Sequence, residues 1–248
     1  MRSTIGHVLR LTGLQYLPVR VRNGPAKGAR WTLYPFSANW RGHTEPEIEC
    51  ALKLIGSLEG KVCWDLGAHF GIYTAAFAIA TGPAGRVYAF EPSPLSYRRC
   101  IRHVQMNGFD WVMVFNAAVG ATAGRQDFLI GEEASASTPH FAYEDEDATA
   151  AKKIPVDVVS LDSLVQQGKI LPADLIKVDV EGYGAHAIKG AERTLAKAHP
   201  MIVMSFHSTW ELAGTRSVLE PIGYEAFDEL GLAIGWDAAL HRTAILKV

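Results

Sequence analysis

The sequence predicts an α/β domain in which helices cover both faces of a mostly parallel sheet. Two patterns support this prediction. Short apolar segments alternate with helix-like segments between residues 61 and 119, and the alternation returns over residues 174–219. Such alternation predicts right-handed βαβ units and a parallel sheet. The 248 residues fit one main domain over residues 44–248, with an N-terminal extension over residues 1–43 packing on it.

The composition is typical of a globular protein, with 48% hydrophobic and 20% charged residues. A formal net charge of −2 and the lack of a long basic block argue against nucleic acid as a partner. The three cysteines form no CxxC pair, which argues against a disulfide framework and a structural zinc site. We expect no membrane span and no secretory leader, and a cytoplasmic location, because no long apolar run is found.

The first helix of the main domain is expected to begin near Thr44, with Thr44 as its N-cap and Glu47 completing a capping box. Ser93 and Pro94 give a similar start signal before a later helix. The next expected elements are a strand over 62–64, a helix over 71–80, a strand over 86–90, a helix over 94–107 and a strand over 111–119.

The middle of the chain breaks this order. Residues 131–151 are rich in Ala, Ser, Glu and Asp and have little periodicity, which predicts a lid or a mobile surface loop. Ser160 is expected to cap a short helix. The other expected elements are strands over 126–130, 154–159, 175–180 and 200–206, helices over 185–198 and up to residue 219, and two C-terminal strands around residues 231–235.

The segment from Val62 to Gly71 leads a buried strand through a glycine-containing turn into a helix. This geometry places backbone N–H groups and a helix N-terminus at the carboxyl edge of the sheet, where α/β proteins bind ligands. Gly67 would let the chain turn sharply against the ligand, and Gly71 would permit a tight start of the helix.

Two cofactors compete for this turn. A dinucleotide fingerprint needs a second glycine, and this chain has His69 in that position. S-adenosylmethionine has no phosphate, and Asp65 suits its cationic sulfonium and amino groups. The sequence therefore favours S-adenosylmethionine, with a nicotinamide-dependent oxidoreductase as the alternative. Glu91, which ends the second strand, can accept both ribose hydroxyls. The expected cofactor-binding residues are Asp65, Gly67, Ala68, His69, Gly71, Tyr73, Thr74, Glu91, Pro92, Ser93, Asn116, Ala117, Ala118 and Asp179.

Several stretches of the chain match a known pattern: residues 65–74, 88–94, 160–164, 176–182 and 189–191. In these stretches, which together span roughly residues 40–207, the chain resembles the FkbM-type methyltransferases. The resemblance implies a Rossmann-like, doubly wound, mostly parallel sheet of seven strands, as in class I methyltransferases, with a C-terminal antiparallel hairpin. It also implies methyl transfer to a hydroxyl of a sugar, polyketide or other natural product, so the expected partner is a small-molecule acceptor.

Two positions depart from the family pattern. The family usually carries glutamates where this chain has Gly184 and Ser205. Because two potential metal ligands are missing, we expect no metal. The same loss leaves open a degenerate, non-catalytic protein that only binds the methyl donor.

The expected acceptor side combines Asp179 and Glu181, at the end of the fourth strand, with His207. Strand alternation sends the two carboxylates to the same side, where they could bind a metal, orient the acceptor or hold the donor's amino group. Helix capping or pairing with Lys177 is the alternative for these carboxylates. His207 is a candidate base because histidine titrates near neutrality, and a hydrogen-bonded edge histidine is the alternative.

Three residues before the first strand are candidates for binding the substrate: Glu45, Trp40 and His43. Glu45 could cover the cofactor, although an exposed acid at the start of a helix is an equal alternative. The sequence is also compatible with a homodimer.

Overall fold

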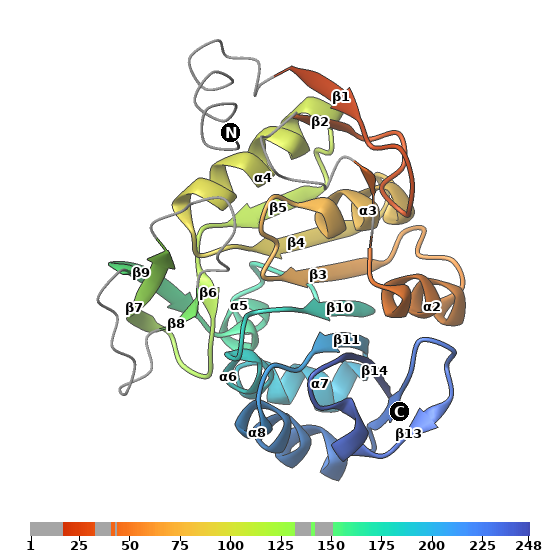
Figure 1. Ribbon diagram of the computed structural model, residues 1–248, viewed down its shortest axis with the longest axis vertical. Coiled ribbons are helices and arrows are strands. Elements are labelled where there is room, and N and C mark those ends of the chain that lie inside the picture. Colours follow the sequence, from red (N-terminus) through yellow and green to blue (C-terminus); the bar gives the residue numbers. More distant parts are fainter. Residues whose placement is uncertain (1–16, 33–40, 43, 132–139, 142–150) are drawn as a thin grey trace, which may run out of the picture.

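The computed structural model describes residues 17–32, 41–42, 44–131, 140–141 and 151–248 (Figure 1). Its main sheet has eight strands in the order β13-β12-β14-β11-β10-β3-β4-β5. Neighbours from β11 to β5 are parallel, whereas β14 runs antiparallel to β11 and β12. The strands are β3 (Val62–Leu66), β4 (Arg86–Phe90), β5 (Val112–Phe115), β10 (Leu175–Val178), β11 (Met201–Ser205), β12 (Glu225–Phe227), β13 (Ala233–Ile234) and β14 (Thr243–Lys247).

The predicted mostly parallel, doubly wound sheet is therefore confirmed, and its strand count needs one correction. The two-residue strand β13 is an eighth strand, paired antiparallel with β12 as a C-terminal hairpin. The last strand, β14, then inserts between β11 and β12.

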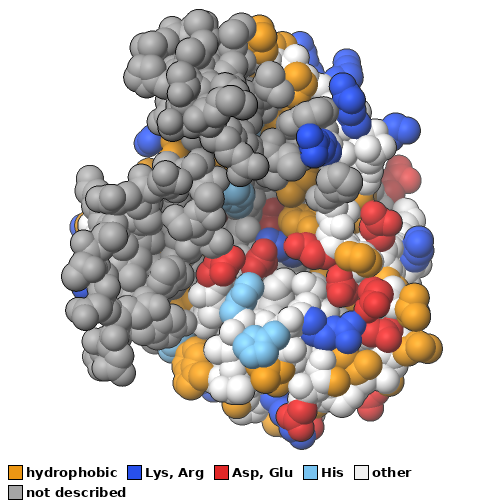
Figure 2. Space-filling view, in the orientation of Figure 1, with side chains coloured by type: hydrophobic (Ala, Val, Ile, Leu, Met, Phe, Trp, Pro, Cys, Tyr) orange, Lys and Arg blue, Asp and Glu red, His pale blue; other side chains and the backbone are white. Residues whose placement is uncertain are grey.

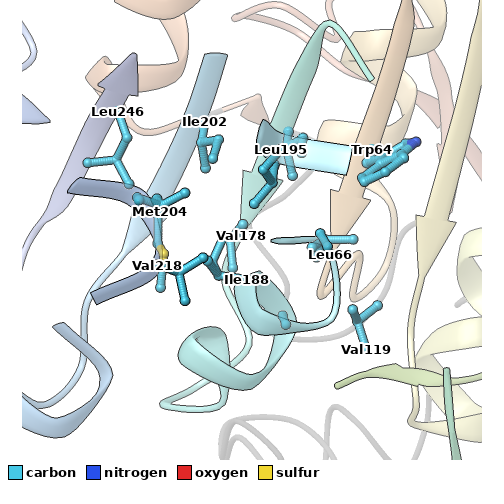
Figure 3. Close-up of a cluster of buried hydrophobic side chains, with 14 of the residues drawn as sticks. Trp64, Leu66, Val119, Val178, Ile188, Leu195, Ile202, Met204, Val218 and Leu246 are labelled. Atoms are coloured by element: carbon cyan, nitrogen blue, oxygen red, sulfur yellow. The ribbon is translucent and has the colours of Figure 1, made fainter. Parts of the chain in front are cut away.

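Alternating residues of the central strands supply two separate cores, one on each face of the sheet. Trp64, Ile176 and Ile202 pack with α5 to α8, as Figure 3 shows in part. Their neighbours Cys63 and Leu175 face α2 and α3 instead. The period of two in buried strands thus positions helices on both faces. The α-helices are α2 (Pro46–Ile55), α3 (Ile72–Thr81), α4 (Pro94–Asn107), α5 (Leu161–Gln166), α6 (Gly184–Lys189), α7 (Glu192–Ala198) and α8 (Thr209–Leu219), with short 3-10 turns η3 (Glu220–Ile222) and η4 (Trp236–Ala239).

Two of the three predicted helix caps are present. The hydroxyls of Ser93 and Ser160 accept from the amides of Ser96 and Ser163. The prediction for Thr44 is wrong, because Glu45 is the N-cap of α2 and no side chain caps this helix. The Thr44 hydroxyl instead donates to Glu49 in the first turn of α2.

The helix expected over residues 185–198 is two helices. The break is explained by Asp162. Its carboxylate accepts from the amides of Arg193 and Thr194 and so caps the start of α7 as a separate helix. Gly190, just before the break, approaches so closely that a Cβ there would overlap the carbonyl oxygen of Gly120.

The strand expected over residues 111–119 is also divided. After β5 the chain leaves the main sheet and enters a second sheet of order β6-β9-β7-β8. The ends of the predicted lid, Gly131 and Ala151, pair with each other in this sheet. Most of that segment lies outside the described residues. The strands of this sheet are β6 (Ala118–Val119), β7 (Gly124–Gly131), β8 (His140–Phe141) and β9 (Ala151–Val159).

The described part of the N-terminal extension forms a short antiparallel pair, β1 (Pro18–Arg20) and β2 (Arg30–Thr32). Trp31 is buried, and its ring stacks on His103 of α4 with centroids 3.6 Å apart. The amide of Thr32 donates to the same imidazole. No helix in the described part of the chain is long and apolar enough to cross a membrane.

Candidate functional site

The candidate site lies where parallel strands β4, β3, β10 and β11 end at the same edge of the sheet. The strand register aligns Leu66 with both Phe90 and Val178, and Val178 with Met204. The residues that follow these strands are therefore neighbours. In Figure 2, acidic side chains form a row across the middle of the face in view, with histidine side chains beside them.

The turn after β3 is shaped by close backbone approach. Gly67 has a φ of +81°, and a Cβ there would overlap the carbonyl oxygen of Asp179. The amides of Gly67 and Ala68 both donate to the Phe90 carbonyl at 3.0 Å. A glycine is therefore required at position 67 by the close approach of the residue that follows β10. The turn joins the ends of three strands.

Glu91 organises this turn from the end of β4. Its carboxylate accepts from the amide of His69 at 2.7 Å and from the amide of Ser93 at 2.8 Å. Burial raises the pKa of Glu91 to about 7, although the two backbone donors oppose the shift. The side-chain amide of Asn116 donates to the carbonyls of Glu91 and Pro92. The three segments predicted to surround the cofactor are therefore linked, and ribose binding by Glu91 stays a prediction.

Replacing Glu91 by alanine tests that link. We expect donor affinity to fall by about 1–3 kcal/mol, because the variant loses a charge-assisted acceptor and leaves two amides without their partner. Isothermal titration with S-adenosylhomocysteine measures the change, and Glu225→Ala, at an exposed position, is the control. Unchanged affinity in Glu91→Ala would show that this carboxylate has no part in the cofactor turn.

A buried cation lies beneath the turn. The Lys177 side chain is 6% exposed, and its Nζ lies 3.5 Å from Asp179 Oδ2 and 3.9 Å from Asp65 Oδ1. It donates to the Gly67 carbonyl at 3.2 Å and lies 5.0 Å from the ring centroid of Tyr73. Burial acts to lower the pKa of Lys177, but Asp179 and Asp65 outweigh it, so the pKa is raised. The ammonium is therefore held in its charged form.

Asp65 lies behind the turn. It is fully buried, Thr74 donates to its Oδ2 at 2.5 Å, and its Oδ1 has no hydrogen-bond partner. Burial raises the pKa of Asp65. In this arrangement Asp65 faces Lys177 and Thr74, and a direct contact with the donor stays a prediction.

The acceptor side brings together the three predicted residues Asp179, Glu181 and His207. His207 Nε2 lies 3.2 Å from Asp179 Oδ1, and its Nδ1 lies 3.8 Å from Glu181 Oε2. The hydrogen bond to Asp179 raises the pKa of His207 against the opposing effect of burial, and Glu181 adds to the rise. Burial acts to raise the pKa of Asp179, but Lys177 and His207 hold it well below its ordinary value.

These three side chains also offer ligand atoms within 4.8 Å of one another, which is close enough to surround a metal ion. However, Asp179 already contacts the ammonium of Lys177 and the imidazole of His207. Lys177 and His207 thus supply the positive charge that balances the Asp179 carboxylate without a metal ion. The expectation of no metal stays a prediction.

Glu45 belongs to the same electrostatic environment. Its amide donates to the Tyr73 hydroxyl at 3.0 Å. Burial raises the pKa of Glu45, Lys177 acts to lower it, and Asp179 acts to raise it further. The start of α2 therefore lies beside the turn after β3. The other two predicted substrate residues, Trp40 and His43, lie outside the described residues.

Sequence reasoning gave two important site residues no functional role. The sequence suggests Lys177 only as an ion-pair partner, yet a lysine in an otherwise apolar strand is a signal for a paired, buried charge. Glu211 is fully buried in the first turn of α8 and was not singled out. The Ser208–Glu211 spacing of a capping box could have indicated it. Ala118, in contrast, is an expected cofactor-binding residue that packs in the core of the second sheet with Phe128.

Comparison with known proteins gives a consistent result. The family model of the methyltransferase FkbM domain matches residues 65–230. The hexuronic acid methyltransferase AglP of Haloferax volcanii is 24% identical over 177 residues, which cover 71% of this chain and 69% of the relative. The crystal structure of the methyltransferase FkbM from Methylobacillus flagellatus has a TM-score of 0.52 and 20% identity, covering 78% of this chain and 44% of that one. The match thus spans less than half of that protein's length, and the structural likeness supports the fold.

Proposed function

The chain belongs to the FkbM methyltransferase family, and from that premise we propose that it methylates a hydroxyl group of a small sugar-like acceptor, with His207 as the base. S-adenosylmethionine, its methyl donor, supplies an activated methyl group when bound. The observation that carries the proposal is the imidazole of His207 between Asp179 and Glu181, at 3.2 Å and 3.8 Å. The hexuronic acid methyltransferase relative supports a sugar-like acceptor.

The charges of the described site fit a cationic donor. Asp65, Asp179 and Glu181 place three carboxylates at this edge, against one buried ammonium on Lys177. A cation gains from such an excess of negative charge, whereas a pyrophosphate is repelled. This balance favours S-adenosylmethionine over the nicotinamide dinucleotide considered as the alternative.

We assign separate roles to the residues of the acceptor side. A hydroxyl acceptor must lose its proton, and neutral His207 can take it at Nδ1, because Nε2 carries the hydrogen that faces Asp179. Asp179 then stabilises the imidazolium through its 3.2 Å contact. Glu181 flanks the other ring nitrogen. The glycine turn and Glu91 hold the donor side, so the chain aligns the two reactants, which supplies much of the rate enhancement in a displacement reaction.

Ligand-induced stabilisation tests the cofactor assignment. S-adenosylhomocysteine at 100 times its Kd should stabilise the fold by about 2.7 kcal/mol, because it binds only the folded state. A thermal melt should therefore shift upward, while NAD at the same concentration leaves it unchanged. A shift with NAD and none with S-adenosylhomocysteine would contradict the donor assignment.

Transfer of a labelled methyl group tests the reaction itself. Incubating the protein with methyl-labelled S-adenosylmethionine and a panel of hydroxylated sugars should give a labelled ether product with at least one sugar. Donor binding without transfer to any hydroxylated sugar would instead support the degenerate, donor-binding alternative.

A further inference from the structure

The side chain of Glu211 links two backbone segments, one after β11 and one at the start of α6. It is fully buried, although it belongs to the first turn of α8. Its Oε2 accepts from the amide of His207 at 2.8 Å, and its Oε1 accepts from the amide of Gly184 at 2.8 Å. One carboxylate thus connects the segment after β11 to the start of α6.

This use of the carboxylate differs from ordinary helix capping. In a capping box, the glutamate reaches back to the amide of its own N-cap residue. Here Ser208 does accept from the Glu211 amide at 3.1 Å, as the box requires. The Glu211 carboxylate, however, bonds one residue further back and also to a different helix. It therefore holds His207 in a way that capping of α8 does not require.

The residue at position 184 makes room for this arrangement. A Cβ added to Gly184 would lie 2.5 Å from Glu211 Oε1 and would overlap the Cε of Met204. Any larger residue must displace the carboxylate or the methionine. Gly184 and Glu211 thus form one packed unit directly beneath His207.

We propose that Glu211 is a positioning residue, whose carboxylate fixes the backbone of His207 so that the imidazole stays within reach of Asp179. The proposal rests on the function proposed above for His207. Hydrogen bonds from amides to a buried carboxylate are among the stronger ones in proteins. The side chain of His207 is partly exposed, and its contacts within the described part of the chain include the carboxylates of Asp179 and Glu181, so the position of its backbone matters for these contacts.

The substitution Glu211→Gln tests this role. Glutamine keeps the shape but points an amide NH₂ at one of the two backbone N–H groups, so one hydrogen bond is lost and two donors face each other. We expect kcat to fall about 10- to 100-fold, since a misplacement of about 1 Å has effects of this size. The Kd for S-adenosylhomocysteine should change less than about 2-fold, because the donor turn is left intact. Glu220→Gln, at the exposed residue that follows α8, is the matched control and should retain full activity.

A double-mutant cycle separates positioning from a general structural effect. If Glu211 acts through His207, Glu211→Gln should lower kcat no further when added to His207→Ala. An equal additional loss in the His207→Ala background would overturn the proposal. If Glu211→Gln is unfolded at the assay temperature, Gly184→Ala replaces it in the same cycle, because the new methyl group displaces the carboxylate from the opposite side.

Amide hydrogen exchange gives a readout that is independent of catalysis. The amides of Gly184 and His207 should be protected in the free protein and should exchange faster in Glu211→Gln. Unchanged exchange at both amides would overturn the proposal even if activity fell. Failure of the proposed function would give a different result, namely no donor binding or no methyl transfer by the unmodified protein.

Discussion

Replacing Lys177 by methionine is expected to destabilise the fold by about 3–5 kcal/mol, which is the usual effect of removing one partner of a buried ion pair. The Lys177 ammonium lies within 4 Å of both Asp65 and Asp179. Methionine fills similar space but leaves these carboxylates without a cation. Urea unfolding at neutral pH measures the loss, and Lys189→Met is a suitable control because its ion pair with Glu192 is exposed and should contribute less than about 1 kcal/mol.

The pH dependence of this effect has a definite sign. The fold holds the pKa of Asp179 below its unfolded value, so the stability from its pairing is present above the ordinary aspartate pKa of about 3.9 and is lost as the pH falls towards the folded value. The difference between the unmodified protein and Lys177→Met should therefore be largest near neutrality and shrink in acid. A difference that stays constant as the pH falls from 7 to well below the ordinary aspartate pKa of about 3.9 would show that lost packing, and not charge, is responsible.

Much of the fold was predictable because the buried strands have simple patterns. The strand Arg86–Phe90 and the helix Pro94–Asn107 agree with the expected ranges. In both cases the signal is local, as a short apolar run or a serine–proline helix start. The elements that failed depend on contacts distant in sequence. Asp162 breaks the helix after Gly190 from about 30 positions away, and no local pattern shows this.

The candidate site likewise has some residues that could be predicted from the sequence and some contacts that could not. Asp179 and His207 could be proposed from sequence because residues that follow parallel strands meet at one edge. The connection of His207 to Glu211 and of Asp179 to Lys177 depends on side-chain direction, which periodicity within a strand or helix fixes only in part. The fully buried state of Asp65 is likewise a result of packing by Thr74 and Lys177.

The structure explains why this chain has Gly184 where the family usually carries a glutamate. The position is too crowded for a side chain, because the Glu211 carboxylate and the Met204 methyl group occupy the space beside it. At the other departure, Ser205 and Thr243 share a hydrogen bond of 2.9 Å across β11 and β14. Both positions are thus integrated in the packing around His207.

His207→Ala is expected to lower turnover about 100- to 10,000-fold while leaving donor binding nearly unchanged, which is the usual contribution of a general base. The imidazole is the group on the acceptor side whose ordinary pKa lies near neutrality, and its two nitrogens lie 3.2 Å and 3.8 Å from the carboxylates of Asp179 and Glu181. Asp179→Asn should impair both turnover and donor binding, because Asp179 also contacts Lys177 beneath the donor turn.

The competing mechanism, a metal-assisted one, predicts the opposite pattern. Asp179, Glu181 and His207 could surround a divalent cation, which would polarise the acceptor hydroxyl and reduce the need for a base. Two measurements on one acceptor therefore decide between the mechanisms: turnover of His207→Ala, and turnover of the unmodified protein after dialysis against EDTA. With a side-chain base, chelation leaves the rate unchanged and His207→Ala loses it. If chelation abolishes turnover, and magnesium or manganese restores it, while His207→Ala remains active, the base assignment is wrong. A loss in Asp179→Asn alone fits either mechanism, so the choice depends on His207 and the chelator together.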